Sequence, residues 1–373
     1  MRRRLTVVAM LLLATVTACS AKATTDQKPV AWTKVDVGQA EPVTLTAHDN
    51  QLLIGLRHRG AKVVPELQLL ENGTRTPIAV KPNPASPYAF EAIWYSIAYD
   101  GKQLLGLGGA AGGAHSNTRW TVWTGTPQTG LIEHPQNFFT FGGQDAGDLY
   151  SAVITPSGKA LLGSWGGVET GNDAMVWLPQ SDGKWTRQSP AKTVLQSTPS
   201  LLVGPSSGTT LGESIVLVGS QVRLAPGVVA QEATVWQSTK LNTGWKRIVL
   251  PDPGGRSQAI TATCTQDCVI SGYVDGQLAI WHLDAFGTAK RLQGVPSIPV
   301  GDKDKLPPPV LSDGKIVQVI AQDNKVKVLS GQDGHWTVQD SQGPEGTPTA
   351  AALLPDHKLY LIAGTSLWQT TLS

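Results

Sequence analysis

Apolar and polar residues alternate along most of the chain in short runs, and the runs repeat. Residues 151–188 hold four apolar-rich runs, SAVIT, ALLGSW, AMVWLP and WTRQ, separated by PSGK, a glycine-rich connection and SDGK. Short runs of this kind, bounded by Gly, Asp, Ser and Pro, are typical of β-strands joined by turns. The stretch therefore predicts a four-stranded antiparallel unit.

The first two strands of this unit recur along the chain. Each copy has an apolar run, a short turn containing Asp, Gly or Asn, and a second apolar run that usually ends in Gly, which is the pattern of a β-hairpin. The copies lie at 45–56, 96–109, 152–167, 209–220, 261–273, 310–321 and 352–364.

Tryptophans mark the outer strands. In the third strand, an apolar residue precedes Trp123, Trp177, Trp236, Trp281 and Trp368. The fourth strand opens on Trp at 184–188, 244–248 and 335–339. A single unit has two apolar faces that it cannot bury alone, whereas radial stacking buries both faces and ring closure removes the open end.

Four-stranded units at this spacing resemble the blades of β-propellers, and the resemblance covers nearly all of 31–373. It implies an all-β fold with seven four-stranded blades, with six or eight blades as alternatives. It also implies that the regular tryptophans fill the space between blades, where each indole N–H can reach a carbonyl at the rim.

The two chain ends predict how the ring closes. The last hairpin is followed by one strand only, SLWQTTL, so its fourth strand is missing. AWTKVDV at 31–37 matches the fourth-strand pattern but has no blade before it. We expect this N-terminal strand to complete the last blade.

The N-terminus has the layout of a signal peptide, with a basic start at 1–4 and an apolar stretch at 5–16 that is too short for a stable membrane span. It ends in Val16-Thr17-Ala18-Cys19, which resembles the lipobox of bacterial lipoproteins. The resemblance implies a signal at 1–18, lipid attachment at Cys19, a polar tether at 19–30 and a propeller domain at 31–373. It places the protein on the extracytoplasmic side of the cell membrane, anchored by lipid.

Charge and cysteine content narrow the function classes. The formal charge is +2, and Arg2, Arg3 and Arg4 belong to the predicted signal, so the remaining chain is close to neutral and has no basic run. This argues against nucleic acid as a partner. Cys264 and Cys268 flank a predicted hairpin turn, and two remaining cysteines in an exported chain favour a disulfide. No His or Cys spacing predicts a metal site or a cofactor, and we expect a monomer.

The long connections indicate where a binding site would lie. In a propeller, the connections after the second and fourth strands share one face, and four neighbouring units have long segments after the second strand, at 55–66, 108–120, 164–173 and 219–233. The connection at 134–148 opens on the same face. Function concentrates on loops that a rigid scaffold positions. The candidate binding residues on this face are Arg57, His58, Arg59, His115, Arg119, Trp165, Glu169, Asp173 and Arg223, with Asp145, Trp94 and Trp120 as further candidates.

Two functions from different classes fit these observations, and the sequence does not distinguish the first of them from a purely structural role as an assembly chaperone. The first is a non-enzymatic, membrane-anchored propeller that presents this face to an envelope protein or to a cell-envelope polymer such as a polysaccharide. The alternative is a carbohydrate-active hydrolase or lyase that uses acidic residues on the same face, which would require paired carboxylates at a hydrolase separation. No nucleophile elbow, phosphate loop or other catalytic motif is present in the sequence.

Overall fold

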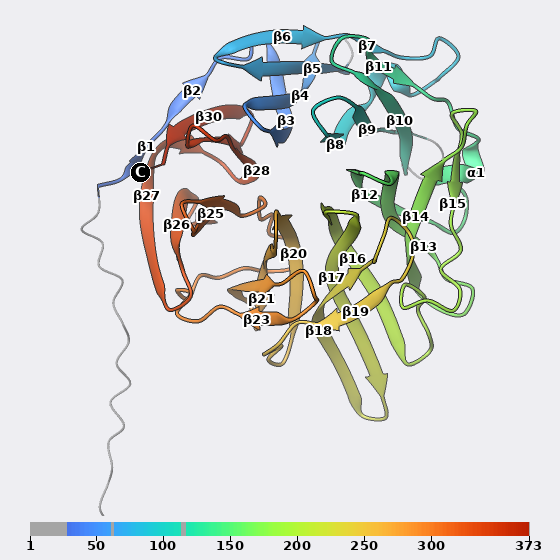
Figure 1. Cartoon of the computed structure of the whole chain (residues 1–373), viewed down its shortest axis with the longest axis vertical. Helices are drawn as coiled ribbons and strands as arrows, with labels where there is room; N and C mark the ends of the chain where they lie inside the picture. The colour runs from blue at the N-terminus through green and yellow to red at the C-terminus, as the bar shows by residue number, and fades with distance from the viewer. Residues whose placement is uncertain (1–27, 61–62, 113–116, 373) are drawn as a thin grey trace, which may run out of the picture.

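The computed structural model describes residues 28–60, 63–112 and 117–372. Seven antiparallel sheets are arranged radially around a central opening, so the chain forms a seven-bladed β-propeller (Figure 1). The first strand of each blade lines the centre of the ring. The predicted fold class is therefore confirmed, with seven blades and not six or eight.

Each blade contains the four strands expected from the repeats. The strands of blades 1 to 4 are β3 (Ala40–His48), β4 (Gln51–Arg59), β5 (Val63–Glu71) and β6 (Thr74–Ile78); β8 (Ile93–Tyr99), β9 (Leu104–Ala111), β10 (Thr118–Thr126) and β11 (Gly130–Glu133); β12 (Ala146–Thr155), β13 (Gly158–Gly166), β14 (Asn172–Pro179) and β15 (Trp185–Arg187); and β16 (Leu201–Leu211), β17 (Ser214–Ala225), β18 (Val228–Gln237) and β19 (Lys246–Val249).

The remaining blades follow the same order. Blades 5 to 7 consist of β20 (Ser257–Cys264), β21 (Cys268–Val274), β22 (Gln277–Leu283) and β23 (Ala289–Arg291); β24 (Val310–Ser312), β25 (Lys315–Gln322), β26 (Lys325–Gln332) and β27 (His335–Glu345); and β28 (Pro348–Leu353), β29 (Lys358–Ala363), β30 (Ser366–Thr371) and β2 (Thr33–Val35). A short strand β7 (Val80–Lys81), a 3₁₀ turn η1 (Ala89–Glu91) and a one-turn helix α1 (Phe138–Phe141) lie in the connections.

The N-terminal strand closes the ring, as the sequence predicts. Strand β2 pairs antiparallel with β30, with Lys34 opposite Trp368, and so supplies the missing fourth strand of blade 7. One feature differs from the expectation, because the residues just before β2 belong to another blade. Strand β1 (Val30–Ala31) pairs in parallel with β27 of blade 6. The N-terminal segment therefore links blades 6 and 7 as well as closing the ring.

The core consists of seven buried clusters, one between each pair of neighbouring blades, in the described part of the chain. The third-strand tryptophans of blades 2 to 5 are completely buried in them: Trp123, Trp177, Trp236 and Trp281. The indole N–H groups of Trp177 and Trp281 donate to the backbone carbonyls of Thr140 and Pro251, as expected for tryptophans packed between blades. Trp236 and Trp368 have no hydrogen-bond partner at the indole nitrogen, so the predicted rim carbonyl is not found at every blade.

Six of the seven innermost strands contain a β-bulge at the same place. In each, one residue of the first strand has no partner in the second strand, and these bulge residues are Val43, Tyr95, Tyr150, Ser206, Ile260 and Thr349. A bulge of this kind re-aims side chains and is common at barrel rims and next to binding sites. The residue that follows the bulge often bonds to the next blade: Ser151 Oγ accepts from Gly208 N at 2.9 Å.

The bulges explain why the second strand so often carries Gly at its end. Gly163, Gly219 and Gly272 lie opposite the bulges of blades 3, 4 and 5. A Cβ atom at Gly219 would lie 2.1 Å from the carbonyl oxygen of Gly204, and the other two sites are similarly closed by backbone. Only glycine permits this close approach of two strands.

The disulfide is present between Cys264 and Cys268, which face each other across the β20–β21 hairpin with their Cα atoms 4.0 Å apart. Cys268 is completely buried in the cluster between blades 4 and 5. The disulfide therefore links the two strands of a hairpin near the centre of the ring.

Two of the predicted long loops are extended strands. At 219–233 the strands β17 and β18 continue to a two-residue turn at Pro226 and Gly227, and the hairpin projects beyond the outline of the ring (Figure 1). At 55–66 the strands β4 and β5 continue to Arg59 and Val63, which form a pair. In the outer part of β17, from Val222 to Ala225, half-buried and exposed residues alternate, which is the pattern of a strand that packs on one side only.

Candidate functional site

The two faces of the ring carry different connections between the strands. The distal face carries the connections from the second to the third strand and those between blades, and the terminal face carries the remaining turns. The described chain begins at Lys28 on the terminal face, where the last strand, β30, also ends. The predicted binding residues belong to the distal side of blades 1 to 4.

On blade 1 the predicted residues form a closed ion-pair cluster. Arg57 Nη2 and Arg59 Nε lie 2.8 and 2.9 Å from the same oxygen of Glu41, and His58 Nδ1 lies 3.6 Å from a carboxylate oxygen of Glu66. Both guanidinium groups therefore share one carboxylate within the blade. On blade 4, Arg223 is paired with Glu232 at 3.0 Å across the projecting hairpin.

On blade 3 two of the predicted residues are buried. Trp165 is 8 % exposed, packs in the cluster between blades 2 and 3, and has the guanidinium of Arg187 3.7 Å from its ring centroid. Asp173 is 3 % exposed and accepts a hydrogen bond from the backbone N–H of Ser197 at 2.7 Å. Burial raises the pKa of Asp173, the Ser197 N–H opposes this, and the nearby Glu169 carboxylate adds to it.

The other candidates differ in their exposure. Glu169 is exposed in the turn between β13 and β14. Trp94 is 2 % exposed and donates from its indole nitrogen to the carbonyl of Glu66 at 2.8 Å, so it is part of the core. Asp145 is exposed. Burial lowers the pKa of Arg187, and the Asp145 carboxylate opposes this shift. His115 lies outside the described residues.

Arg119 and Trp120 lie at a pocket between blades 2 and 3. The pocket has a volume of about 290 Å³. Its polar lining residues are Asn117, Thr118, Arg119, Asp148, Tyr150, Ser164 and Asn172. The remaining wall is formed by Trp120, by the segment 141–143 and by residues 146–147.

The wall on blade 3 is built on a bulge. Tyr150 is the bulge residue of β12, and its hydroxyl lies 3.1 Å from Ser164 Oγ on the adjacent strand. Burial raises the pKa of Tyr150, the Ser164 hydrogen bond opposes this, and the Asp148 carboxylate adds to it. The Ser164 hydroxyl also accepts from the backbone N–H of Asp148 at 3.2 Å.

Exposed aromatic side chains lie against two lining residues of this pocket, Trp120 and Arg119. Tyr95, the bulge residue of β8, is 48 % exposed and stacks edge to face with Trp120 at a centroid distance of 4.7 Å. Phe138 and Phe139 of α1 are 50 % and 72 % exposed, with ring centroids 5.2 Å apart. The guanidinium of Arg119 lies 4.8 Å from the centroid of Phe138 and joins the two groups.

We call Tyr95, Arg119, Trp120, Phe138 and Phe139 the aromatic surface. Sequence reasoning found only Arg119 and Trp120 of these five, although it placed the segment 134–148 on the correct face. For Tyr95, the missed signal was a pair of tyrosines, Tyr95 and Tyr150, at the bulge position of two neighbouring blades. It was missed because a bulge has no signature in the apolar pattern.

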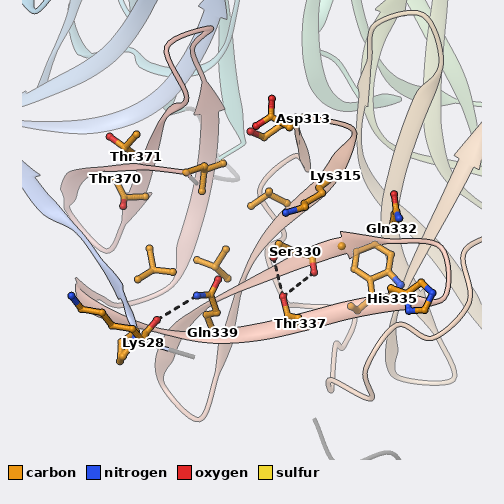
Figure 2. Close-up of a pocket in the computed structure, with 18 of the residues that line it drawn as sticks. Lys28, Asp313, Lys315, Ser330, Gln332, His335, Thr337, Gln339, Thr370 and Thr371 are labelled. Atoms are coloured by element: carbon orange, nitrogen blue, oxygen red, sulfur yellow. Dashed lines mark hydrogen bonds between the residues drawn. The ribbon is translucent and has the colours of Figure 1, made fainter. Parts of the chain in front are cut away.

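A larger groove lies on the terminal face, between blades 6 and 7 (Figure 2). Its volume is about 1230 Å³, and Lys28, Val317, Val328, Trp336 and Thr371 are among the residues that line it. Figure 2 shows Lys28 beside Gln339 at one end, where the Gln339 side chain donates to the Lys28 carbonyl at 3.3 Å.

The central opening forms a third cavity of about 680 Å³, lined by the first strands of the blades. Small and apolar side chains dominate this lining. Within the described ranges, no cluster of three His, Cys, Asp or Glu side chains could hold a metal ion. No helix in that part of the chain is long and apolar enough to cross a membrane.

Comparison with known proteins supports the fold alone. No family model matches the sequence, and no curated protein matches it. A streptogramin B lyase structure is similar with a TM-score of 0.58 at 12 % identity, covering 92 % of this chain and 97 % of that one. Virginiamycin B lyase from Staphylococcus aureus gives a TM-score of 0.57 at 11 % identity, covering 92 % of this chain and 98 % of that one. A catalytically inactive form of the same lyase with quinupristin gives 0.58 at 11 % identity, with the same coverage.

Proposed function

We propose that this protein is an exported propeller, anchored by lipid at Cys19, that binds a component of the cell envelope through its aromatic surface. The observation that carries the proposal is the composition of that surface. Tyr, Trp, Phe and Arg dominate the energetic centres of protein interfaces. Contiguous exposed apolar groups of this kind on a soluble domain mark interaction sites.

The position of the chain ends supports the proposed orientation. The described chain starts at Lys28 on the terminal face, and the segment from Cys19 to Lys28 spans at most about 30 Å when fully extended. A lipid at Cys19 would hold the terminal face toward the membrane. The aromatic surface would then point away from the membrane, toward the rest of the envelope.

The alternative, a carbohydrate-active enzyme, has one observation in its favour and a stronger one against it. Glu169 and Asp173 are close enough for the first to raise the pKa of the second, as in a pair of catalytic carboxylates. However, Asp173 is 3 % exposed and binds the Ser197 N–H, so its carboxyl group cannot reach a substrate. The lyase structures share only the fold, and a propeller fold hosts many functions, so their activity is not transferred.

The experiment captures partners from detergent-solubilised envelope extract with the purified protein as bait. We expect Phe138→Ala combined with Phe139→Ala to lose the captured component and to leave the melting temperature nearly unchanged, because both side chains are exposed. The matched control is Phe286→Ala, since Phe286 is 88 % exposed but lies in the β22–β23 turn on the terminal face. Loss of capture in the control variant, with capture retained in the α1 variant, would place the site on the terminal face and refute the proposal.

The anchor has a separate test. A Cys19→Ser variant should move from the membrane fraction to the soluble extracytoplasmic fraction, because the thioether link needs the thiol. If this variant stays in the membrane fraction, the protein is held there by something other than a lipid at Cys19.

A further inference from the structure

Two opposite charges line the pocket between blades 2 and 3, and neither has a counter-ion in the described part of the chain. Arg119 comes from β10 of blade 2, and Asp148 comes from β12 of blade 3. Among the residues that the structure describes, neither side chain forms an ion pair or a hydrogen bond. The other predicted arginines of the distal face differ, because Arg57, Arg59 and Arg223 are all paired with glutamates.

The two charges lie on different walls of the pocket. The guanidinium of Arg119 is held over the ring of Phe138 at 4.8 Å, on the side of β10 and α1. The carboxylate of Asp148 lies near the Tyr150 hydroxyl, whose pKa it helps to raise, on the side of β12 and β13. They do not form an ion pair with each other, and both line the pocket.

Asp148 is exposed and Arg119 is half-buried, so both charges are accessible to a ligand. A ligand that carries both complementary charges forms a charge-assisted hydrogen bond at each wall. A volume of about 290 Å³ suits a group of amino-acid size and excludes a large one. Asn117, Thr118 and Asn172 supply further hydrogen-bonding groups around it.

We propose that this pocket binds the zwitterionic ammonium–carboxylate group of an α-amino acid, with Arg119 binding the carboxylate and Asp148 binding the ammonium group. The proposal rests on the proposed function of the distal face and names the chemistry that the face recognises. The side chain, or the polymer to which the amino acid is attached, leaves the pocket along Tyr95 and Trp120. The same group occurs in free amino acids, and on an envelope peptide where a diamino acid keeps one α-ammonium and its α-carboxylate both free.

The test measures binding of defined probes to the purified protein by isothermal titration calorimetry and ligand-observed NMR at low salt. The probes are free L-alanine, D-alanine and L-phenylalanine, their N-acetyl and C-terminal amide derivatives, and purified cell-wall peptides. We expect a free amino acid or a wall peptide to bind. Capping either charged group of the bound probe should weaken binding by about tenfold or more, because the complex then loses one charge-assisted hydrogen bond. Binding of wall peptides but not of free amino acids would identify the polymer as the source.

Two variants assign the charges. The Arg119→Gln variant should bind the free amino acid and its C-terminal amide equally well, but should still bind the N-acetyl derivative more weakly. The Asp148→Asn variant should bind the free amino acid and its N-acetyl derivative equally well, but should still bind the amide more weakly. Asp182→Asn with Lys184→Gln is the control, since this pair of opposite charges is exposed in the β14–β15 turn on the terminal face. Equal binding of free and capped probes by the unmodified protein, or no binding of any zwitterion at millimolar concentration, would overturn the proposal.

The result is separable from that of the envelope-capture experiment. If the extract component is still captured through Phe138 and Phe139 while no zwitterion binds, the zwitterion pocket is wrong and the proposed function stands. If capture does not depend on α1 but the probes bind as expected, the pocket stands as a small-molecule site, and the wider interaction surface is wrong.

Discussion

The indole nitrogen of Trp32 donates a hydrogen bond to Ser341 Oγ at 3.1 Å, across 309 positions of sequence. The backbone N–H of Trp32 also donates to the carbonyl of Gln342 at 3.0 Å. Trp32 is 7 % exposed and packs in the cluster between blades 6 and 7, at the point where the chain leaves β1 and enters β2. One residue therefore holds both blades at the closure of the ring.

Replacing Trp32 by Ala should destabilise the protein by about 3–5 kcal/mol, the usual cost of truncating a buried Trp. The measurement is the free energy of unfolding from denaturant titration. Lys34→Ala is the control, because Lys34 is exposed in β2 and keeps its backbone pairing with Trp368, so the effect should stay within about 0.5 kcal/mol. Similar effects for both variants would mean that closure depends on the strand and not on the Trp32 side chain.

Gly219→Ala should destabilise the protein by about 1–3 kcal/mol, because its new Cβ would lie 2.1 Å from the Gly204 carbonyl oxygen and the bulge would have to move. Thermal unfolding followed by circular dichroism measures the effect. The matched substitution is Gly301→Ala, where the nearest atom would be a side-chain oxygen at 3.5 Å. If Gly219→Ala melts with the unmodified protein, the bulges tolerate a Cβ and the proposed reason for these glycines fails.

Trp165→Ala should lower the free energy of unfolding by about 3–5 kcal/mol, whereas Phe139→Ala should change it by about 0.5 kcal/mol or less. The first side chain is 8 % exposed between two blades, and the second is 72 % exposed on α1. Parallel denaturant titrations compare the two variants. A neutral Trp165→Ala variant would contradict a packing role for this residue.

Tyr273 should ionise well above ordinary tyrosines. Burial and the adjacent Asp302, which accepts the hydrogen bond of the phenol, raise its pKa from 10.0 to about 12. Because the folded state favours the neutral phenol, Tyr273 contributes stability that is fully present below pH 10 and is lost as the pH rises from 10 toward 12. Ultraviolet titration of the phenols should show a late step that Tyr273→Phe removes.

The unfolding free energy of Tyr273→Phe should correspondingly fall less steeply between pH 10 and 12. Far-ultraviolet circular dichroism recorded at each pH ensures that the protein is still folded. All phenols titrating below pH 11 in the folded protein would contradict this prediction.

Much of the fold could be predicted from local patterns. The strand pairs of each blade, the buried third-strand tryptophans and the closing strand at β2 all follow from repeats of apolar runs and turns, because a blade is built from neighbouring segments of chain. The Cys264–Cys268 disulfide followed from the same repeats, since both cysteines flank one hairpin turn.

The candidate site was predicted only as a face. Arg57, Arg59, Arg223 and Asp173 are charged in the sequence, but each finds a partner in the structure, and those partners could not be identified without the register of the strands. The tyrosines of the site escaped notice because a bulge shifts a side chain from one side of a strand to another without changing the composition of the strand.

The sequence by itself determined the seven-bladed ring and its closure, because these depend on the period of apolar residues within hairpins. The tertiary structure decided which charges are free. Arg119 and Asp148 lie on different blades, and only the packing of blade 2 against blade 3 brings them to opposite walls of one pocket without allowing them to pair.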